Sequence, residues 1–188
     1  IGGIAYWMPD YIHDYRGQPD LEKVNRYFGL IVVVAGLSAT ILGGLAGDAL
    51  RSRIPGSYFL VSGTAMVLAF PMLLLMIALP FPWAWVPLVL FVFFLFFNTG
   101  PTNTILANVT HPLLRAPGFA LNILIIHLIG DAISPPVMGA IAGFSSLNWS
   151  CAFVSVMVLV GGVLWLCGVR YLERDTALAP TRGPSAAP

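Results

Sequence analysis

The stretch LNILIIHLIGDAISPPVMG, residues 121–139, is apolar enough to cross a bilayer, yet it contains two ionisable side chains, His127 and Asp131. A charged group at the centre of a membrane helix costs roughly 2.5–3.5 kcal/mol, so it is tolerated mainly where it faces a bundle interior or a water-filled cavity. The two residues are four apart and therefore lie on one helical face. Pro135 and Pro136 then remove two backbone donors, which predicts a kink or break in the helix. A polar stripe that ends in a broken helix is typical of a pathway through a membrane.

The composition places the whole chain in a membrane. Of its 188 residues, 58% are hydrophobic and only 9% are charged, whereas an ordinary soluble domain has about 25% charged residues. We therefore predict an integral, multi-pass, all-α membrane protein. The net charge of +1 argues against a nucleic-acid partner. Cys151 and Cys167 are separated by about 24 Å along one predicted helix, which is too far for a disulfide.

Six segments have the character of membrane helices, and each except the first has the roughly 20 residues needed to span a bilayer. They cover residues 1–12, 27–46, 57–79, 83–109, 114–144 and 149–172. Because the chain begins at Ile1 with a short apolar stretch, we expect a fragment whose first helix is truncated. Residues 1–172 are predicted to form one transmembrane bundle. Residues 173–188, rich in Pro and Ala, are predicted to be a disordered cytoplasmic tail.

The distribution of basic residues predicts the orientation. With six spans, alternate connections share a side, and cytoplasmic connections are enriched in Lys and Arg. One side holds Arg51, Arg53, Arg115, Arg170, Arg174 and Arg182, and the other holds Arg16, Lys23 and Arg26. The first side is therefore predicted to be cytoplasmic. A composition rich in Arg and nearly free of Lys further indicates a bacterial source, and hence the inner membrane.

Two rows of small residues run along the segment 27–46 and just beyond it. A spacing of four between small residues lets two membrane helices approach closely. One interpretation is static packing, and the other is a surface on which helices slide during a conformational cycle. The rows are Gly36, Thr40 and Gly44, and Ala39, Gly43 and Gly47.

The connection after that segment is GGLAGDALRSR, residues 43–53. It resembles the loop motif Gly-x-x-x-Asp-basic-x-Gly-basic-basic of the major facilitator superfamily, in which an acid held against a helix end or an Arg locks one conformation. Asp48 and Arg53 match that pattern, and Arg51 stands where the motif has Gly. We assign these three residues and Arg115 as candidates for conformational gating. Arg115 either pairs with Asp48 or anchors its helix at lipid headgroups, and the loop could also be a solvated turn that follows the positive-inside rule.

Polar residues interrupt the segment 83–109 in FFNTGPTN, residues 96–103. Proline frees a carbonyl inside a helix, and nearby polar side chains can either satisfy such groups or line a cavity that binds a polar headgroup. The sequence leaves both roles open. The candidate substrate-binding residues are Asn98, Thr99 and Asn103 from this stretch, Tyr6 and Trp7 from the first segment, and Asn122, His127 and Asp131 from the fifth.

The pair of His127 and Asp131 has other conceivable roles. A structural zinc needs four ligands, and the sequence offers no evident third, so we predict no metal site. Covalent catalysis needs a matching Ser or Cys nucleophile, and none stands out, so we predict neither enzymatic activity nor a cofactor. The remaining alternative is a neutral His–Asp hydrogen bond that ties helices together.

Four stretches together resemble the C-terminal half of a Spinster-type transporter of the major facilitator superfamily. They are GGIAYWMPDYI, GGLAGDALRSR, FFNTGPTN and LRAPGFALNILIIHLIGDAISPPVMGAI, in that order. The resemblance covers residues 2–172 and is most specific in LNILIIHLIGDAISPP. It implies twelve helices in two pseudosymmetric halves with the substrate between them. This chain would then hold helices seven to twelve, and its partner would be a missing N-terminal six-helix half.

Spinster-like proteins are associated with the movement of lysophospholipids and sphingoid lipids. The resemblance therefore implies a secondary transporter that moves an amphipathic lipid by alternating access. Proton coupling stays open: either Asp131 or His127 changes its protonation during the cycle, or the missing half carries the coupling residue. Two alternatives also stay open. One is a major facilitator carrier for small organic anions or drugs, and the other is a non-transporting intramembrane enzyme or receptor.

Overall fold

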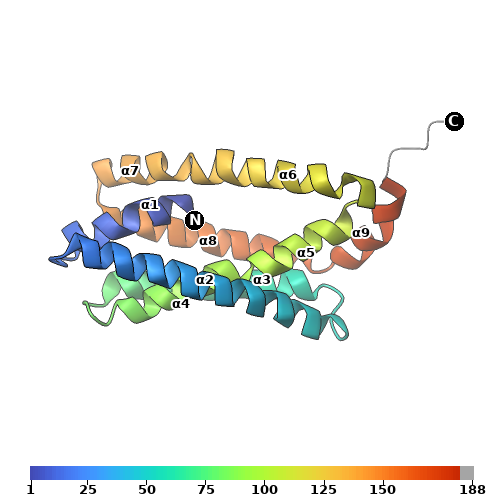
Figure 1. The fold of residues 1–188 in the computed structure, drawn as a ribbon, viewed down its shortest axis with the longest axis horizontal. Helices are drawn as coiled ribbons and strands as arrows, with labels where there is room; N and C mark the ends of the chain where they lie inside the picture. The colour runs from blue at the N-terminus through green and yellow to red at the C-terminus, as the bar shows by residue number, and fades with distance from the viewer. Residues whose placement is uncertain (183–188) are drawn as a thin grey trace.

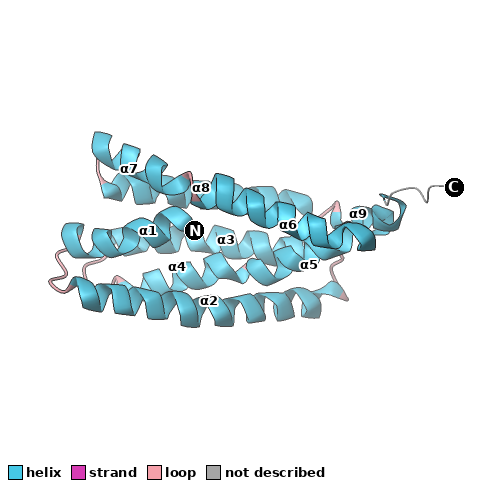
Figure 2. Cartoon of the chain, turned by 45° about the horizontal axis from the view of Figure 1, so that its top comes forward, coloured by secondary structure: helices cyan, strands magenta, loops and turns pink. Residues whose placement is uncertain are grey.

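The computed structural model describes residues 1–182, and every regular element in that range is a helix (Figure 1 and Figure 2). The elements are α1 (Gly2–Asp10), η1 (Tyr11–Tyr15), α2 (Leu21–Arg51), α3 (Ser57–Ala78), α4 (Trp85–Phe97), α5 (Thr99–Val109), η2 (Pro112–Leu114), α6 (Arg115–Ile125), η3 (Ile126–Asp131), α7 (Ser134–Phe144), α8 (Leu147–Gly168), α9 (Leu172–Leu178) and η4 (Ala179–Arg182). Five stretches are long and apolar enough to cross a membrane: Leu21–Arg51, Ser57–Ala78, Trp85–Val109, Pro112–Phe144 and Leu147–Gly168. The predicted all-α, multi-pass membrane fold is confirmed.

The helix boundaries differ most from the predicted ones in α2. Hydropathy predicts a span over residues 27–46, but α2 begins at Leu21 and ends at Arg51. The extra N-terminal turn is polar and has its own stabilising contact, because the Asp20 carboxylate accepts a hydrogen bond from the Lys23 backbone N–H at 3.0 Å. Hydropathy records only the part of a helix that lies in lipid, so it misses turns held by such caps.

Helix α9 corrects the prediction that disorder begins at residue 173. It continues to Leu178, and η4 follows it to Arg182. Leu172 is buried in a small apolar cluster with Tyr58 and Ile105, which anchors the start of α9 to α3 and α5. These contacts cannot be inferred from the Pro and Ala content of the tail. Residues 183–188, the rest of the predicted tail, lie outside the described residues.

The packing is centred on α3, which lies against α8, α4 and α2. At the α3–α8 contact the two backbones come close, and a Cβ on Gly63 would lie 2.8 Å from the Gly162 carbonyl oxygen. The largest apolar core joins α1, η1, α2, α3, α4, α7 and α8 and includes Met8, Tyr11, Leu73, Phe91 and Met138. Figure 1 shows α6 and α7 running along one side of the bundle, above α1 and α8.

Helix α2 approaches the junction of α4 and α5 through its small residues. Pro101 has no N–H to donate to the Phe97 carbonyl, and the regular helix is interrupted between Phe97 and Thr99. The same carbonyl lies so close to Gly43 that a Cβ there would overlap it. Gly100 lies against the backbone of α2 at Thr40 in a similar way. Static packing therefore accounts for these small residues, and sliding stays a hypothesis.

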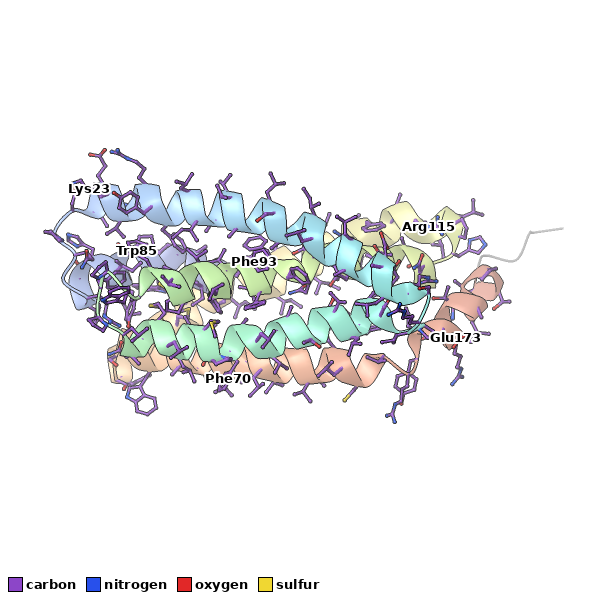
Figure 3. All side chains as sticks on the ribbon, turned by 90° about the horizontal axis from the view of Figure 1, so that it is seen from below. Lys23, Phe70, Trp85, Phe93, Arg115 and Glu173 are labelled. Carbon is purple, nitrogen blue, oxygen red and sulfur yellow. The ribbon has the colours of Figure 1, made fainter. Side chains whose placement is uncertain are left out.

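The two ends of the bundle carry different residues, as the alternation of connections predicts. Figure 3 shows Lys23 and Trp85 at one end and Arg115 and Glu173 at the other. The second end is the one with the connection after α2 and the start of α6, where most of the arginines lie. We call it the arginine-rich end.

Candidate functional site

The helix that contains His127 and Asp131 is broken, and the break has a form that the sequence did not predict. After α6 the backbone widens into the π-helical turn η3, where the Ala132 N–H donates to the His127 carbonyl at 2.9 Å. Pro135 and Pro136 occupy the first turn of α7 and leave the carbonyls of the preceding turn without helical donors. A wider turn relieves the clash of a proline ring with the carbonyl four residues earlier. Such π turns occur frequently at functional sites.

The predicted pair forms on this turn. His127 Nδ1 lies 2.9 Å from Asp131 Oδ2, and the two side chains are 68% and 33% exposed. The second carboxylate oxygen of Asp131 accepts a hydrogen bond from the Gly2 backbone N–H at 2.9 Å. The carboxylate is therefore held from two elements, while the imidazole stays open on the surface of the described residues.

Helix α1 packs closely against the break. The Gly3 N–H donates to Ser134 Oγ at 2.8 Å, and the Trp7 indole N–H donates to the Pro135 carbonyl at 2.9 Å. Glycines make this approach possible, since a Cβ on Gly2 would lie 2.7 Å from the Asp131 Cα. The indole thus fixes α1 to the broken helix at the level of the prolines.

A groove of about 450 Å³ lies between α1 and the break. It joins an aromatic wall with one carboxylate and a kinked backbone. Five residues that the sequence singled out line it together: Tyr6, Trp7, Asp131, Pro135 and Pro136. Ala132 and Gly139 are the other residues that line the groove. We call this hollow the break groove.

The other polar candidates lie elsewhere. Asn98 sits at the α4–α5 junction, where its amide donates to the Leu95 carbonyl at 2.7 Å and its oxygen accepts from Thr102 Oγ1 at 3.4 Å. These bonds match the repair role that the sequence left open. Thr99 begins α5, Asn103 is exposed one turn later, and Asn122 lies half-buried in α6. None of the three lines the break groove.

Two of the four candidate gating residues, Asp48 and Arg51, meet at the arginine-rich end through Tyr58, which the sequence did not single out. Tyr58 donates its hydroxyl proton to Asp48 at 2.7 Å, and the Arg51 guanidinium lies 5.3 Å from the centre of the same ring. Arg53 is exposed. Arg115 instead donates to the Ala107 carbonyl at 3.0 Å, and no ion pair joins it to Asp48 within residues 1–182.

Sequence reasoning missed Arg16, which it assigned to an outer loop. The guanidinium donates to the last carbonyls of α3, at 3.2 Å for Met76 and 2.6 Å for Ile77, and to the Tyr11 hydroxyl at 3.0 Å. Tyr11 in turn donates to Asn148 Oδ1 at 2.7 Å. One arginine therefore joins η1, α3 and α8. Basic side chains often bind the last carbonyls of a helix. The helix that Arg16 caps is distant in the sequence, so no local pattern indicates this contact.

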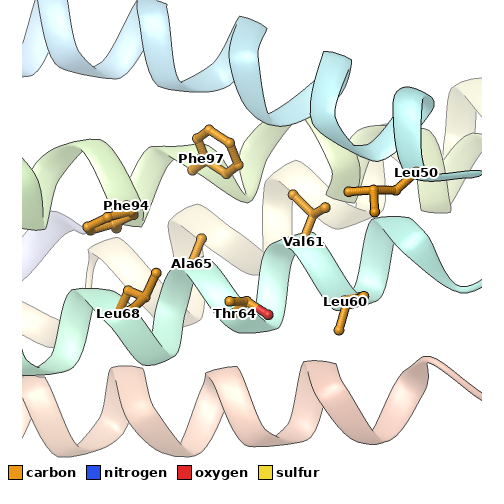
Figure 4. A pocket seen from close by; sticks show the side chains of 8 residues that line it. All are labelled: Leu50, Leu60, Val61, Thr64, Ala65, Leu68, Phe94 and Phe97. Atoms are coloured by element: carbon orange, nitrogen blue, oxygen red, sulfur yellow. The ribbon is translucent and has the colours of Figure 1, made fainter. Parts of the chain in front are cut away.

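Another hollow, of about 260 Å³, opens between α3 and α4 (Figure 4). Its walls are aliphatic and aromatic apart from the hydroxyl of Thr64, which leaves it without a charged group. It is lined by Leu50, Leu60, Val61, Thr64, Ala65, Leu68, Phe94 and Phe97.

The chain is similar to curated Spinster proteins over most of its length, although no family model matches it. It is 26% identical over 197 residues to the probable sphingolipid transporter spinster homolog 2 of Arabidopsis thaliana, covering all of this chain and 40% of that protein. It is 29% identical over 207 residues to the protein spinster homolog 3 of Danio rerio, covering 95% and 41%. It is 28% identical over 150 residues to the protein spinster of Drosophila melanogaster, covering 75% and 25%. The resemblance stated from the motifs is confirmed, and the chain spans about two-fifths of the length of the first two relatives.

Proposed function

We propose that this chain is the C-terminal half of a secondary transporter that moves a single-chain amphipathic lipid, a lysophospholipid or a sphingoid lipid, by alternating access. The other half would be the N-terminal six helices of the full-length protein. The arginine-rich end would face the cytoplasm, in a bacterial inner membrane. Similarity to a protein named as a probable sphingolipid transporter supports the class of substrate.

The observation that carries the proposal is an ionisable pair on a membrane-length helix whose surface is uncovered. In the most apolar stretch of 18 residues within Pro112–Phe144, no residue is buried by the described part of the chain. In the matching stretches of the other four helices, 22–33% of the residues are buried. His127 and Asp131 lie in this helix, and lipid is a costly environment for them. Their face therefore needs either water or further protein, and a central cavity between two halves supplies both.

The break groove has the chemistry that a lipid headgroup needs. Asp131 offers a carboxylate, and the rings of Tyr6 and Trp7 offer apolar and cation–π contact. His127 does not line the groove, but it is bonded to Asp131 and offers a further donor or acceptor beside it. We propose that the headgroup binds there. Asn98, Thr99, Asn103 and Asn122 would contribute further polar groups to the cavity wall from α4, α5 and α6.

The kink at Pro135 and Pro136 supplies a place for α7 to move relative to α6. Because the π turn has replaced the regular helical bonds, a change of angle there breaks few of them. At the arginine-rich end, the cluster of Asp48, Tyr58 and Arg51 would stabilise one of the two conformations. Asp131 or His127 would exchange a proton in the cycle if this half takes part in coupling.

The test is lipid movement by the full-length protein in liposomes. Labelled lysophospholipid is placed in one leaflet, and its appearance in the other is followed with a protein-free control. We expect protein-dependent movement of chemically unchanged lipid. A cleaved or modified product would identify an intramembrane enzyme instead, and competition by short water-soluble anions but not by lysolipids would identify a small-anion carrier.

A further inference from the structure

A second groove, which shares no lining residue with the break groove, runs along α2 and α4. Three hollows of about 240, 230 and 360 Å³ follow one another there, and neighbouring hollows share lining residues. The first and second share Tyr27 and Trp85, and the second and third share Leu30 and Ile31. In Figure 3, Lys23 and Trp85 mark the end of the bundle and Phe93 lies nearer its middle. The hollows are therefore parts of one continuous groove, which we call the α2–α4 groove.

The mouth of the α2–α4 groove is polar and carries both signs of charge. Gln18, Asp20 and Lys23 line it, and the Lys23 ammonium lies 3.2 Å from the Asp20 carboxylate. The two side chains are 64% and 41% exposed, and a pair that exposed holds together weakly. The ammonium is thus available to a phosphate, and the carboxylate to a cation.

Aromatic rings form the next part of the groove. Tyr27 meets Trp85 edge to face, with the ring centres 5.8 Å apart, and both rings line the first two hollows. Aromatic faces bind quaternary ammonium groups, and they also suit the boundary between headgroup and acyl chain.

Beyond the rings the lining becomes apolar. It consists of Leu30, Ile31, Val34, Ala35, Val89 and Phe93, with Ser38 at the far end. From Tyr27 to Ser38 the groove follows α2 for about 16 Å. A doubly charged mouth, followed by aromatic rings and then by an apolar tract, fits a zwitterionic headgroup on an acyl chain.

We propose that the α2–α4 groove binds a single-chain phospholipid with a zwitterionic headgroup, at a site separate from the break groove. The phosphate meets Lys23, the headgroup ammonium meets Asp20 and the rings of Tyr27 and Trp85, and the chain lies along Val34 and Phe93. The inference rests on the proposed function only for the class of ligand, since binding at this groove does not require transport.

The experiment uses lysophosphatidylcholine with a photoreactive group near the end of its acyl chain. The full-length protein is irradiated with this probe in detergent, and labelled peptides are mapped by mass spectrometry. We expect labelling at residues 34–38 and 89–93. Val34→Trp fills the apolar tract and should lower that labelling about tenfold, whereas Leu37→Trp, on the same helix but outside the groove, should leave it unchanged.

Two further arms separate this site from ordinary membrane lipid and from the transport proposal. Lys23→Gln should weaken binding of the probe about fivefold, and Arg26→Gln, one turn further along α2, should not. Asp131→Asn should keep the labelling even if it abolishes transport, because it lies in the other groove. Equal displacement of the probe by diacyl phosphatidylcholine and lysophosphatidylcholine, or equal labelling of the Val34 and Leu37 variants, would overturn the proposal.

Discussion

Tyr11 shows how much a single buried hydroxyl contributes to this bundle. It is fully buried, and it both donates to Asn148 and accepts from Arg16. Tyr11→Phe keeps the ring but leaves the Asn148 oxygen without this donor, which costs about 1–3 kcal/mol for a buried group. We expect a lower melting temperature of the purified full-length protein. Tyr15→Phe, on an exposed ring that stacks on Tyr11, is the control and should melt like the parent.

Asp20 gives a pH dependence with a definite sign. The Lys23 backbone N–H donates to its carboxylate, and this bond, with the Lys23 side chain, holds the pKa of Asp20 below its ordinary value of 3.8. A lowered pKa stabilises the folded state above pH 3.8, and this stability is lost as the pH falls through the folded pKa. The difference in melting temperature between the parent and Asp20→Ala should therefore be constant near neutral pH and shrink below pH 3.8. A difference that grew on acidification would contradict the capping role.

At the same scale, the sequence predicts some contacts and conceals others. A spacing of four was enough to bring His127 and Asp131 together at 2.9 Å, because the contact is local. The bonds of Arg16 to the end of α3 span some sixty residues, and nothing near Arg16 in the sequence signals them. The hydrogen bond between Tyr58 and Asp48 was missed for a related reason. The two residues lie on either side of the connection between α2 and α3, and the path of that connection decides whether they meet.

Among the elements, the contact of α2 with the α4–α5 junction is the most sensitive to substitution. A Cβ on Gly43 would overlap the backbone carbonyl of Phe97, whereas a Cβ on Gly44 would meet nothing within 4 Å. We expect Gly43→Ala to destabilise the protein by about 1–3 kcal/mol, because backbone cannot give way as a side chain can. Gly44→Ala is the adjacent control and should stay within about 0.5 kcal/mol of the parent. Thermal unfolding of both variants checks this, and equal melting temperatures would contradict the packing.

The elements also show the limits of hydropathy. Five of the six predicted segments correspond to membrane-length helices, because long apolar runs leave little choice of structure. The prolines predicted the break before α7, but not the π turn, which depends on how the backbone accommodates two proline rings at once. Helix α9 depends on burial of Leu172 against α3 and α5, a contact that no local pattern records.

For the whole molecule, the uncovered surface of α6 and η3 is the feature that matters most. A membrane-length helix that exposes an ionisable pair leaves these two side chains in a costly environment unless water or further protein covers them. The chain spans about two-fifths of the length of its first relatives. The resemblance to one half of a transporter was available from the motifs, but the exposed face on which the proposed central cavity rests required the structure.

The most direct test of the central claim is lysophospholipid movement by the full-length protein with Asp131→Asn, measured in liposomes against Asp14→Asn. Asp14 is a fair control, since it also pairs with a histidine, His13, at 2.6 Å, but lies outside the break groove. Loss of a charged hydrogen bond to the headgroup predicts an initial rate at least about tenfold lower for Asp131→Asn and unchanged for Asp14→Asn. Equal rates for the parent and for a folded, equally reconstituted Asp131→Asn would contradict a role for the break groove in the pathway.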